Sequence, residues 1–179
     1  MNQFEAAFKG VEAIRAFAAA GGTFTDEQDI FGKTAAMYAV WNGADAIKEF
    51  AAVGGTFTDQ QGDVLGVTAA MYAAWKGADA IKAFAEAGGR FTDQQNEAWG
   101  KTAAMHAAWC GPAAIKAFAE AGGAFTLQRD KDGMTVADWA AWNGPEAAKT
   151  YAEVTATAKP GCQRPASARL TRSRTPKPE

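Results

Sequence analysis

The sequence predicts an all-α repeat solenoid of about five stacked two-helix units, each with a projecting loop. Two residue types recur at intervals of 34, 34 and 33 positions, namely threonines and tryptophans: Thr34, Thr68, Thr102 and Thr135, and Trp41, Trp75, Trp109 and Trp142. Glycine pairs recur at intervals of 33, 34 and 34 positions. A fixed period of this length is typical of proteins in which each unit packs only on its neighbours.

The unit at residues 68–101 shows why helices are expected. Thr68 is a helix N-cap candidate because its hydroxyl can accept a hydrogen bond from a free backbone amide, and the alanine-rich run 69–75 that follows favours a helix. Gly77 ends this helix, and a second helix follows it directly and ends at the glycine pair 88–89. In two later units Pro112 and Pro145 stand at the start of the second helix, where proline is tolerated.

A longer polar segment separates the second helix from the next unit. Residues 89–100 are bounded by glycines and are too many for a helix–helix turn. We interpret this segment as a finger that projects from the stack as a loop or β-hairpin. The order within a unit is therefore helix, tight turn, helix and finger.

Two short helices and a finger per unit resemble the ankyrin repeat. The nearest local match is DKDGMT at 130–135 followed by AAWNG at 140–144, and the Glu-Ala-Gly segments at 86–88 and 120–122 are similar to the end of the family's second helix. The resemblance spans roughly residues 1–156. The tetratricopeptide repeat has a similar period, but its long helices and short turns leave no room for the finger.

The sequence also departs from the family pattern. The family's Thr-Pro-Leu-His opening becomes Thr-Ala-Ala-Met from Thr34, Thr68 and Thr102, and Thr-Val-Ala-Asp from Thr135. The histidine that ties neighbouring loops together in the family is therefore absent. A helix–helix turn about one residue shorter and a longer finger give a period of 34 rather than 33.

The resemblance divides residues 1–156 into a domain of five units. Their approximate bounds are 1–33, 34–67, 68–101, 102–134 and 135–156. The first unit is expected to be an N-terminal cap with Phe8 at the tryptophan position. Residues 157–179 are rich in proline and basic residues and are expected to form a disordered tail.

Charge distinguishes the repeats from the tail. Residues 1–158 carry 12 Lys and Arg against 19 Asp and Glu, a net charge of −7, whereas residues 159–179 carry six basic residues and one acid, a net charge of +5. An acidic body disfavours binding of a phosphate backbone by the repeats. The tail is a candidate for contact with nucleic acid or an anionic surface, or else a flexible solubilising end.

Few residues suit catalysis or metal binding. Cys110 and Cys162 do not suggest a disulfide framework, which favours a reducing, intracellular and most simply cytoplasmic setting. The single histidine, His106, occupies the position of Tyr38 and Tyr72 and is given no catalytic role. No apolar stretch is long enough to span a membrane. We expect no cofactor, no metal and no small-molecule substrate.

Acidic residues gather in the fingers but lack the spacing of a calcium-binding EF-hand loop. We interpret them as solvated loop charge. They are Asp26, Glu27, Asp29, Asp59, Asp63, Asp93 and Glu97.

The ankyrin resemblance implies a concave binding face built from first helices and fingers. The first helices would contribute Trp41, Asn42, Trp75, Lys76, Trp109, Cys110, Trp142 and Asn143. The fingers would contribute Ile30, Phe31, Lys33, Val64, Leu65, Val67, Ala98, Trp99 and Lys101.

The four repeat tryptophans have two interpretations. They could form an aromatic ladder for a protein partner, since tryptophan buries a large area at little rotamer cost. Alternatively, they could fill the interior, because alanine replaces larger aliphatic residues along both helices and the volume must be occupied. Three methionines with the same period are interpreted as core residues: Met37, Met71 and Met105.

These observations predict a monomeric, non-enzymatic scaffold or adaptor that binds another protein through its fingers and its first helices. The alternative is a regulatory or effector protein whose basic tail, residues 159–179, engages nucleic acid or an anionic surface.

Overall fold

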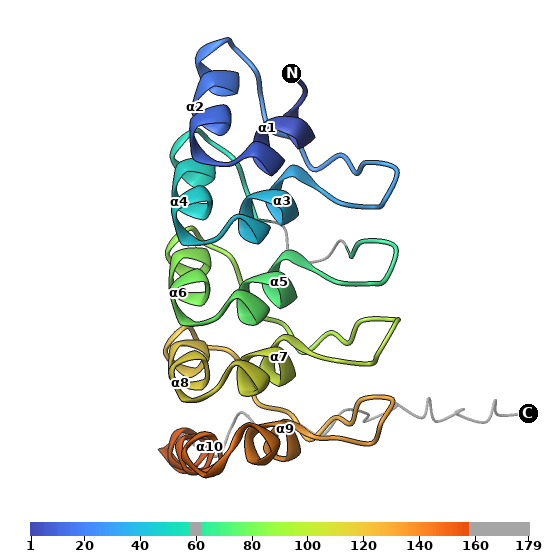
Figure 1. Ribbon diagram of the computed structural model, residues 1–179, viewed down its shortest axis with the longest axis vertical. Helices are drawn as coiled ribbons and strands as arrows, with labels where there is room; N and C mark the ends of the chain where they lie inside the picture. Colours follow the sequence, from blue (N-terminus) through green and yellow to red (C-terminus); the bar gives the residue numbers. More distant parts are fainter. Residues whose placement is uncertain (58–61, 158–179) are drawn as a thin grey trace, which may run out of the picture.

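The structure, a computed structural model, describes residues 1–57 and 62–157, which form five stacked helix pairs and no strand (Figure 1). The first helices of the pairs are α1 (Gln3–Lys9), α3 (Ala35–Trp41), α5 (Ala69–Lys76), α7 (Ala103–Cys110) and α9 (Val136–Asn143). The second helices are α2 (Val11–Ala19), α4 (Ala44–Ala52), α6 (Ala78–Glu86), α8 (Pro112–Glu120) and α10 (Pro145–Thr157). The two sets form parallel columns, and the fingers project as loops beyond the first helices (Figure 1). The predicted all-α repeat solenoid is confirmed.

Threonine caps the first helix of every unit after the first. The hydroxyl oxygens of Thr34, Thr68 and Thr102 each accept a 3.3 Å hydrogen bond from the backbone N–H of the methionine three residues on. Thr135 accepts in the same way from the N–H of Asp138, whose carboxylate accepts in return from the N–H of Thr135. The N-cap predicted at Thr68 is therefore confirmed.

A single glycine joins the two helices in the third and fourth units. Gly77 is both the C-cap of α5 and the N-cap of α6, and its φ of +95° lies in a region that side chains rarely adopt. Gly111 does the same between α7 and α8 with a φ of +99°. The turn can be this short because glycine tolerates that backbone conformation.

A continuous row of aromatic rings fills the space between the second helices and the finger bases. Phe50, Phe84 and Phe118, from α4, α6 and α8, are at most 1% exposed. Successive ring centroids along the row are 4.7–5.4 Å apart. The row consists of Phe17, Phe24, Phe50, Phe57, Phe84, Phe91, Phe118, Phe125 and Tyr151.

Aliphatic side chains complete the core around this row. Ile47, Ile81 and Ile115 are fully buried on the second helices. The three repeat methionines are 1–2% exposed, as expected of core residues. Phenylalanine, isoleucine and methionine side chains thus fill the space that the small alanines leave in the interior. The tryptophans are not needed to fill it.

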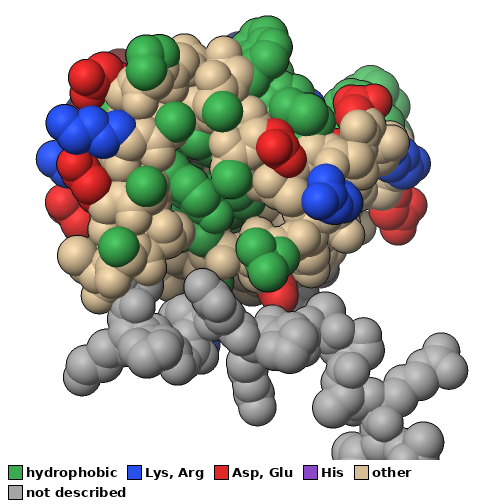
Figure 2. All heavy atoms as spheres, turned by 90° about the horizontal axis from the view of Figure 1, so that it is seen from below, with side chains coloured by type: hydrophobic (Ala, Val, Ile, Leu, Met, Phe, Trp, Pro, Cys, Tyr) green, Lys and Arg blue, Asp and Glu red, His purple; other side chains and the backbone are tan. Residues whose placement is uncertain are grey.

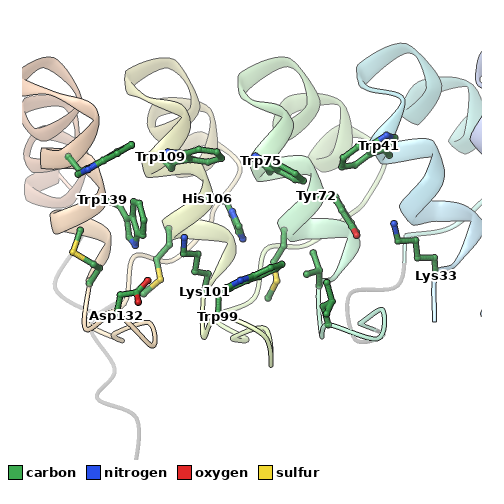
Figure 3. Close-up of a pocket in the computed structure, with 16 residues that line it drawn as sticks. Lys33, Trp41, Tyr72, Trp75, Trp99, Lys101, His106, Trp109, Asp132 and Trp139 are labelled. Atoms are coloured by element: carbon green, nitrogen blue, oxygen red, sulfur yellow. The ribbon is translucent and has the colours of Figure 1, made fainter. Parts of the chain in front are cut away.

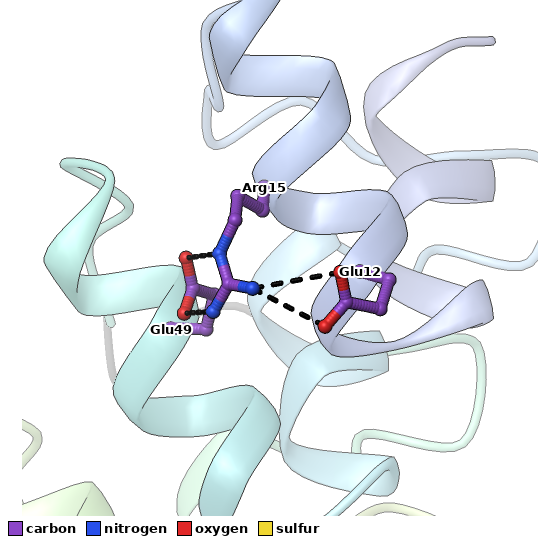
Figure 4. A network of polar contacts seen from close by, with 3 residues as sticks. All are labelled: Glu12, Arg15 and Glu49. Atoms are coloured by element: carbon purple, nitrogen blue, oxygen red, sulfur yellow. Dashed lines mark hydrogen bonds and ion pairs between the residues drawn. The ribbon is translucent and has the colours of Figure 1, made fainter.

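Contacts at the N-terminal end tie the first unit to the second. Phe8 lies edge-on to Tyr38 with ring centroids 5.7 Å apart. On the side of the second helices, the Nε and Nη2 atoms of Arg15 donate to the two carboxylate oxygens of Glu49 at 3.2 and 2.7 Å, and its Nη1 donates to Glu12 (Figure 4). This bidentate geometry orients α2 against α4.

No further unit of the described residues packs on the outer face of the last unit. Seen along the stack from this end, hydrophobic side chains occupy the middle of the face, and charged side chains lie towards its edges (Figure 2). Ala137 and Ala141 are exposed here, whereas the equivalent Ala104 and Ala108 of the preceding unit are buried.

Several expectations concern residues outside those described. The basic tail, Cys162 and Asp59 lie beyond the described ranges. Helix α10 ends at Thr157, one residue after the expected boundary of the repeats. Among residues 1–57 and 62–157, no helix is both long enough and apolar enough to cross a membrane.

Candidate binding groove

A groove of about 830 Å³ runs between the first helices and the fingers of the last four units (Figure 3). Its walls come from α3, α5, α7 and α9 on one side and from the fingers on the other. Most of the lining side chains are aromatic or aliphatic, and the charged ones are Lys33, Lys101 and Asp132. Such a surface can bury apolar groups and offers a few charges to orient them.

Three tryptophans from consecutive first helices form a row along this groove (Figure 3). Trp41, Trp75 and Trp109, here called the tryptophan row, are each 40–41% exposed. The ring centroids of Trp41 and Trp75 are 5.4 Å apart with an edge-on geometry, and those of Trp75 and Trp109 are 6.4 Å apart and stacked. The row therefore lies at the surface, and the interior is filled without it.

Trp142 departs from the row. It is 66% exposed, and its ring contacts Trp139 of the same helix at a centroid distance of 5.8 Å. The expected ladder of four tryptophans is thus a row of three plus an end pair on α9.

The groove lysines lie against aromatic rings. Lys33 Nζ is 5.3–5.9 Å from the ring centroids of Tyr38, Trp41 and Tyr72. Lys101 Nζ is 3.9 Å from the ring centroid of Trp139. These are cation–π distances, and neither lysine forms an ion pair with another described residue.

Each finger is folded around one polar side chain, as the second finger shows. Asp63 Oδ1 accepts hydrogen bonds from the N–H groups of Leu65 and Val67 at 2.9 and 3.1 Å. Its other oxygen, Oδ2, accepts from the Tyr72 hydroxyl at 2.6 Å. Asp63 is 7% exposed, so it holds the finger against α5 from within.

The first and last fingers repeat this arrangement. Asp29 accepts from the Tyr38 hydroxyl at 2.6 Å, and Asp130 accepts from Trp139 Nε1 at 2.9 Å. Burial alone would raise the pKa of Asp29, but the hydrogen bonds from Tyr38 and two backbone N–H groups outweigh it and lower that pKa. Burial and the bond to Asp29 raise the pKa of Tyr38 to about 12. The interpretation of Asp29 and Asp63 as solvated loop charge is therefore wrong.

Backbone hydrogen bonds connect the tips of neighbouring fingers. At distances of 2.9–3.1 Å, an N–H in one finger donates to a carbonyl in the finger before it: Val64 to Phe31, Ala98 to Leu65, and Lys131 to Trp99. The fingers therefore form one connected wall of the groove rather than independent loops.

Comparison with protein families supports the same architecture. The family model described as ankyrin repeats (3 copies) matches residues 4–94, which is half of the chain. The chain belongs to the ankyrin repeat family. A comparison with curated proteins found no match. Ankyrin repeats are generally protein–protein interaction modules. The ankyrin stack continues past the matched residues through α7, α8, α9 and α10.

The third finger of the ankyrin stack lacks one internal bond. Asn96 and His106 stand where the second finger has Asp63 and Tyr72, but Asn96 Nδ2 and His106 Nε2 are buried and have no hydrogen-bond partner among the described residues. Burial, followed by the charge of Lys101, lowers the pKa of His106 to about 4. The imidazole is therefore neutral at neutral pH.

Three expected site residues connect neighbouring ankyrin units. Each directly follows a tryptophan and donates a hydrogen bond to the first helix of the preceding unit. The acceptor is a backbone carbonyl near the end of that helix, where carbonyl groups lack a donor within the helix. Asn42 Nδ2 donates to Ala7 and Phe8 at 2.8 Å, Cys110 Sγ to Trp75 at 3.0 Å, and Asn143 Nδ2 to Trp109 at 2.6 Å. These groups are engaged between units and are not free for a partner. Burial also raises the pKa of the Cys110 thiol.

Lys76 stands at the same position but makes a different contact. Its Nζ lies 5.4 Å from the ring centroid of Trp41, at the edge of the tryptophan row. It is exposed and remains a candidate contact residue.

The expected finger residues other than the two lysines differ in their exposure and in whether they line the groove. Leu65 and Trp99 are 43% and 47% exposed and line the groove. Ile30, Phe31 and Val64 are 55–89% exposed but do not line it, so they form the outer tips of the fingers. Val67 lines the groove as a buried residue, and Ala98 is half-buried outside it. Val67 therefore contributes to the floor and not to an exposed contact surface.

Some groove residues were not among those expected from the sequence. Tyr72, His106 and Trp139 share one position, four residues after the capping threonine and three before the tryptophan. Residues three apart lie on the same helix face, so this spacing was the signal that could have identified them. Met71 and Met105 were assigned to the core and also reach the groove floor.

Proposed function

We propose that this ankyrin chain is a non-enzymatic scaffold or adaptor that binds a segment of a partner protein in the groove. The tryptophan row carries this proposal. Its three rings are buried on one side by the stack and two-fifths exposed on the other. Tryptophan in such a position gives a large contact area and loses little rotamer freedom on binding.

The fingers supply a second part of the contact surface. Leu65 and Trp99 face the groove, and Phe31 lies at the outer tip of the first finger. Because backbone bonds hold the fingers together, this wall is ordered before a partner arrives. An ordered surface loses less entropy on binding, which favours affinity.

The chemistry of the groove supports binding rather than catalysis. Its lining is mainly aromatic and aliphatic, and its histidine is neutral, with Nε2 buried. Cys110 forms no disulfide with another described residue, which is compatible with a reducing, intracellular setting.

Site-specific photocrosslinking tests the proposal. A benzoylphenylalanine residue would replace Trp75 in the groove or, as a matched control, the exposed Lys82 on α6, and the protein would be irradiated in extract of the cells that produce it. We expect a discrete crosslinked partner from position 75 and none from position 82. Crosslinks from position 82 alone would show that the partner binds the other side of the stack.

A second variant tests the fingers. Phe31, Leu65 and Trp99 would be changed together to Ser, and capture of the crosslinked partner would be compared with that of the unchanged protein. We expect much weaker capture. Equal capture would show that these three finger residues are not part of the interface.

A further inference from the structure

We propose that the groove binds an extended, mainly apolar peptide that carries two carboxylates, one placed at Lys33 and the other at Lys101. This inference rests on the proposed function and specifies the chemistry of the partner segment. It combines the position of the two lysines, the distance between them and the spacing of the aromatic rings.

The two lysines of the groove indicate that the bound peptide carries carboxylates of complementary charge. Lys33 and Lys101 are half-buried in an apolar groove, lie over aromatic rings, and form no ion pair with a described carboxylate. The charge of Lys33 acts on Asp29, but the oxygens of Asp29 already accept hydrogen bonds from Tyr38 and from the finger backbone. The acidic lining residue, Asp132, belongs to the finger after Lys101. A lysine in such surroundings has lost part of its hydration, so an incoming carboxylate gains more there than at an open surface.

The repeat fixes the separation of the two cationic positions. Lys33, Val67 and Lys101 occupy the same place in three successive units, directly before the capping threonine. Because packed helices lie about 8–10 Å apart, two steps along the stack correspond to about 16–20 Å. An extended chain rises about 3.3 Å per residue, so carboxylates about six residues apart reach both lysines from the same side of the chain.

The tryptophan row favours an extended conformation between the carboxylates. Its ring centroids are 5.4 and 6.4 Å apart. Two residues of an extended chain span about 6.6 Å, and alternate side chains point to opposite sides. Every second side chain would therefore meet a new ring, while the side chains between them face Lys33, Val67 and Lys101. The matching pattern is an acid at positions one and seven, and apolar residues at two, four and six.

The groove is less suited to single-stranded nucleic acid, which also combines aromatic stacking with positive charge. Residues 1–158 carry a net charge of −7, which opposes a phosphate backbone. The planes of Trp41 and Trp75 are 61° apart, so they do not offer parallel faces to successive bases.

Fluorescence anisotropy with a designed peptide tests the inference. The probe is fluorescein-labelled Asp-Leu-Ser-Phe-Ser-Leu-Asp with a blocked C-terminus, and the controls carry Asn at both ends or place the first acid at position three. We expect the Asp probe to bind the full chain about tenfold more tightly than the Asn probe at low salt, and this preference to shrink at high salt. The shifted acid should lose most of the gain.

Protein variants then test whether Lys33 and Lys101 cause the preference for the Asp probe. Lys33→Gln with Lys101→Gln should bind the Asp and Asn probes equally, and the Asn probe as tightly as the unchanged protein does. Lys82→Gln with Lys116→Gln removes the same charge from exposed positions on α6 and α8 and should keep the preference. Thermal unfolding of each variant checks that it is folded.

Several results would overturn the inference. One is equal affinity for the Asp and Asn probes, or no binding of either probe. Another is a preference for Asp that survives in the variant lacking Lys33 and Lys101. A third is tighter binding of a labelled oligothymidylate that displaces the peptide. If a partner still crosslinks at position 75 in any of these cases, only the peptide chemistry is wrong. If that crosslink is also absent, the groove function itself fails.

Discussion

The Tyr72 hydroxyl donates a 2.6 Å hydrogen bond to Asp63, nine residues earlier in the chain, and so fixes the second finger to helix α5. Asp63 holds the same finger from inside through two backbone N–H groups. One carboxylate thus sets both the shape of the finger and its position against the groove. The backbone link from Leu65 to Ala98 carries this position on to the third finger.

Changing Tyr72 to Phe should destabilise the protein by about 1–3 kcal/mol, because it leaves a buried carboxylate oxygen without its donor. Urea unfolding followed by circular dichroism measures this. Tyr38→Phe makes the same chemical change at a more exposed position and should cost less, about 0.5–1 kcal/mol. Equal costs would mean that burial of the carboxylate does not set the energy of this bond.

Restoring the missing bond in the third finger should stabilise the stack. Asn96→Asp together with His106→Tyr recreates the pair found in the second finger and should add about 1–2 kcal/mol at neutral pH. Each change alone should gain less, because one member of the pair still lacks its partner. A double-mutant cycle by urea unfolding gives the coupling energy. Additive effects would show that the two side chains do not meet.

His106 should make the stability depend on pH between about 4 and 6.5. Its pKa in the folded state is about 4, below the unfolded value of about 6.5, so the unfolded chain binds the proton more readily in this interval. Stability contributed by the neutral imidazole is present above pH 6.5 and is lost as the pH falls. The loss from pH 7 to pH 5 should be roughly 2 kcal/mol.

Unfolding of the unchanged protein and of His106→Tyr at pH 7 and pH 5 checks this, and the variant should lose little stability. Asp29 does not interfere, because its pKa is lowered and it titrates below this interval. An unchanged pH dependence in the variant would assign the effect to other groups.

The helices and turns could be predicted because single residues determine them locally. Thr68 caps a helix through its own hydroxyl, and Gly77 permits a backbone conformation that other residues avoid. The exposure of the tryptophans could not be predicted in the same way. It depends on whether other residues fill the interior, and only the row of buried phenylalanines in the structure resolves that.

The sequence contains a regular spacing that marks the hydrogen bonds between fingers and helices, but this spacing can be interpreted only once the fold is known. An acid precedes an aromatic residue by nine positions at 29/38, 63/72 and 130/139, and the third finger has ten positions between Asn96 and His106. The spacing matters because the finger folds back on the helix that follows it, which no local pattern indicates. For the same reason Asn42, Cys110 and Asn143, which each follow a tryptophan, were assigned to the surface, although each bonds to the preceding unit.

Contact between fingers should be sensitive to a single methyl group at Gly66. This glycine has a φ of +72°, and a Cβ atom there would lie 2.6 Å from the backbone nitrogen of Glu97 in the next finger. Gly66→Ala must therefore strain the backbone and push the fingers apart. We expect a loss of about 2–4 kcal/mol in urea unfolding, together with faster hydrogen exchange at the Ala98 amide, which bonds to Leu65.

Gly133 is a matched control for this change. It has a similar φ of +78° at the equivalent place in the last finger, but a Cβ atom there meets nothing within 4 Å. Gly133→Ala should therefore lower the free energy of unfolding by about 1–2 kcal/mol, through backbone strain alone. Hydrogen exchange at the Ala98 amide should stay unchanged. The difference between the two variants measures the packing of one finger on the next. If the variants lose the same stability, the fingers behave as independent loops, and the groove wall is not ordered in advance of binding.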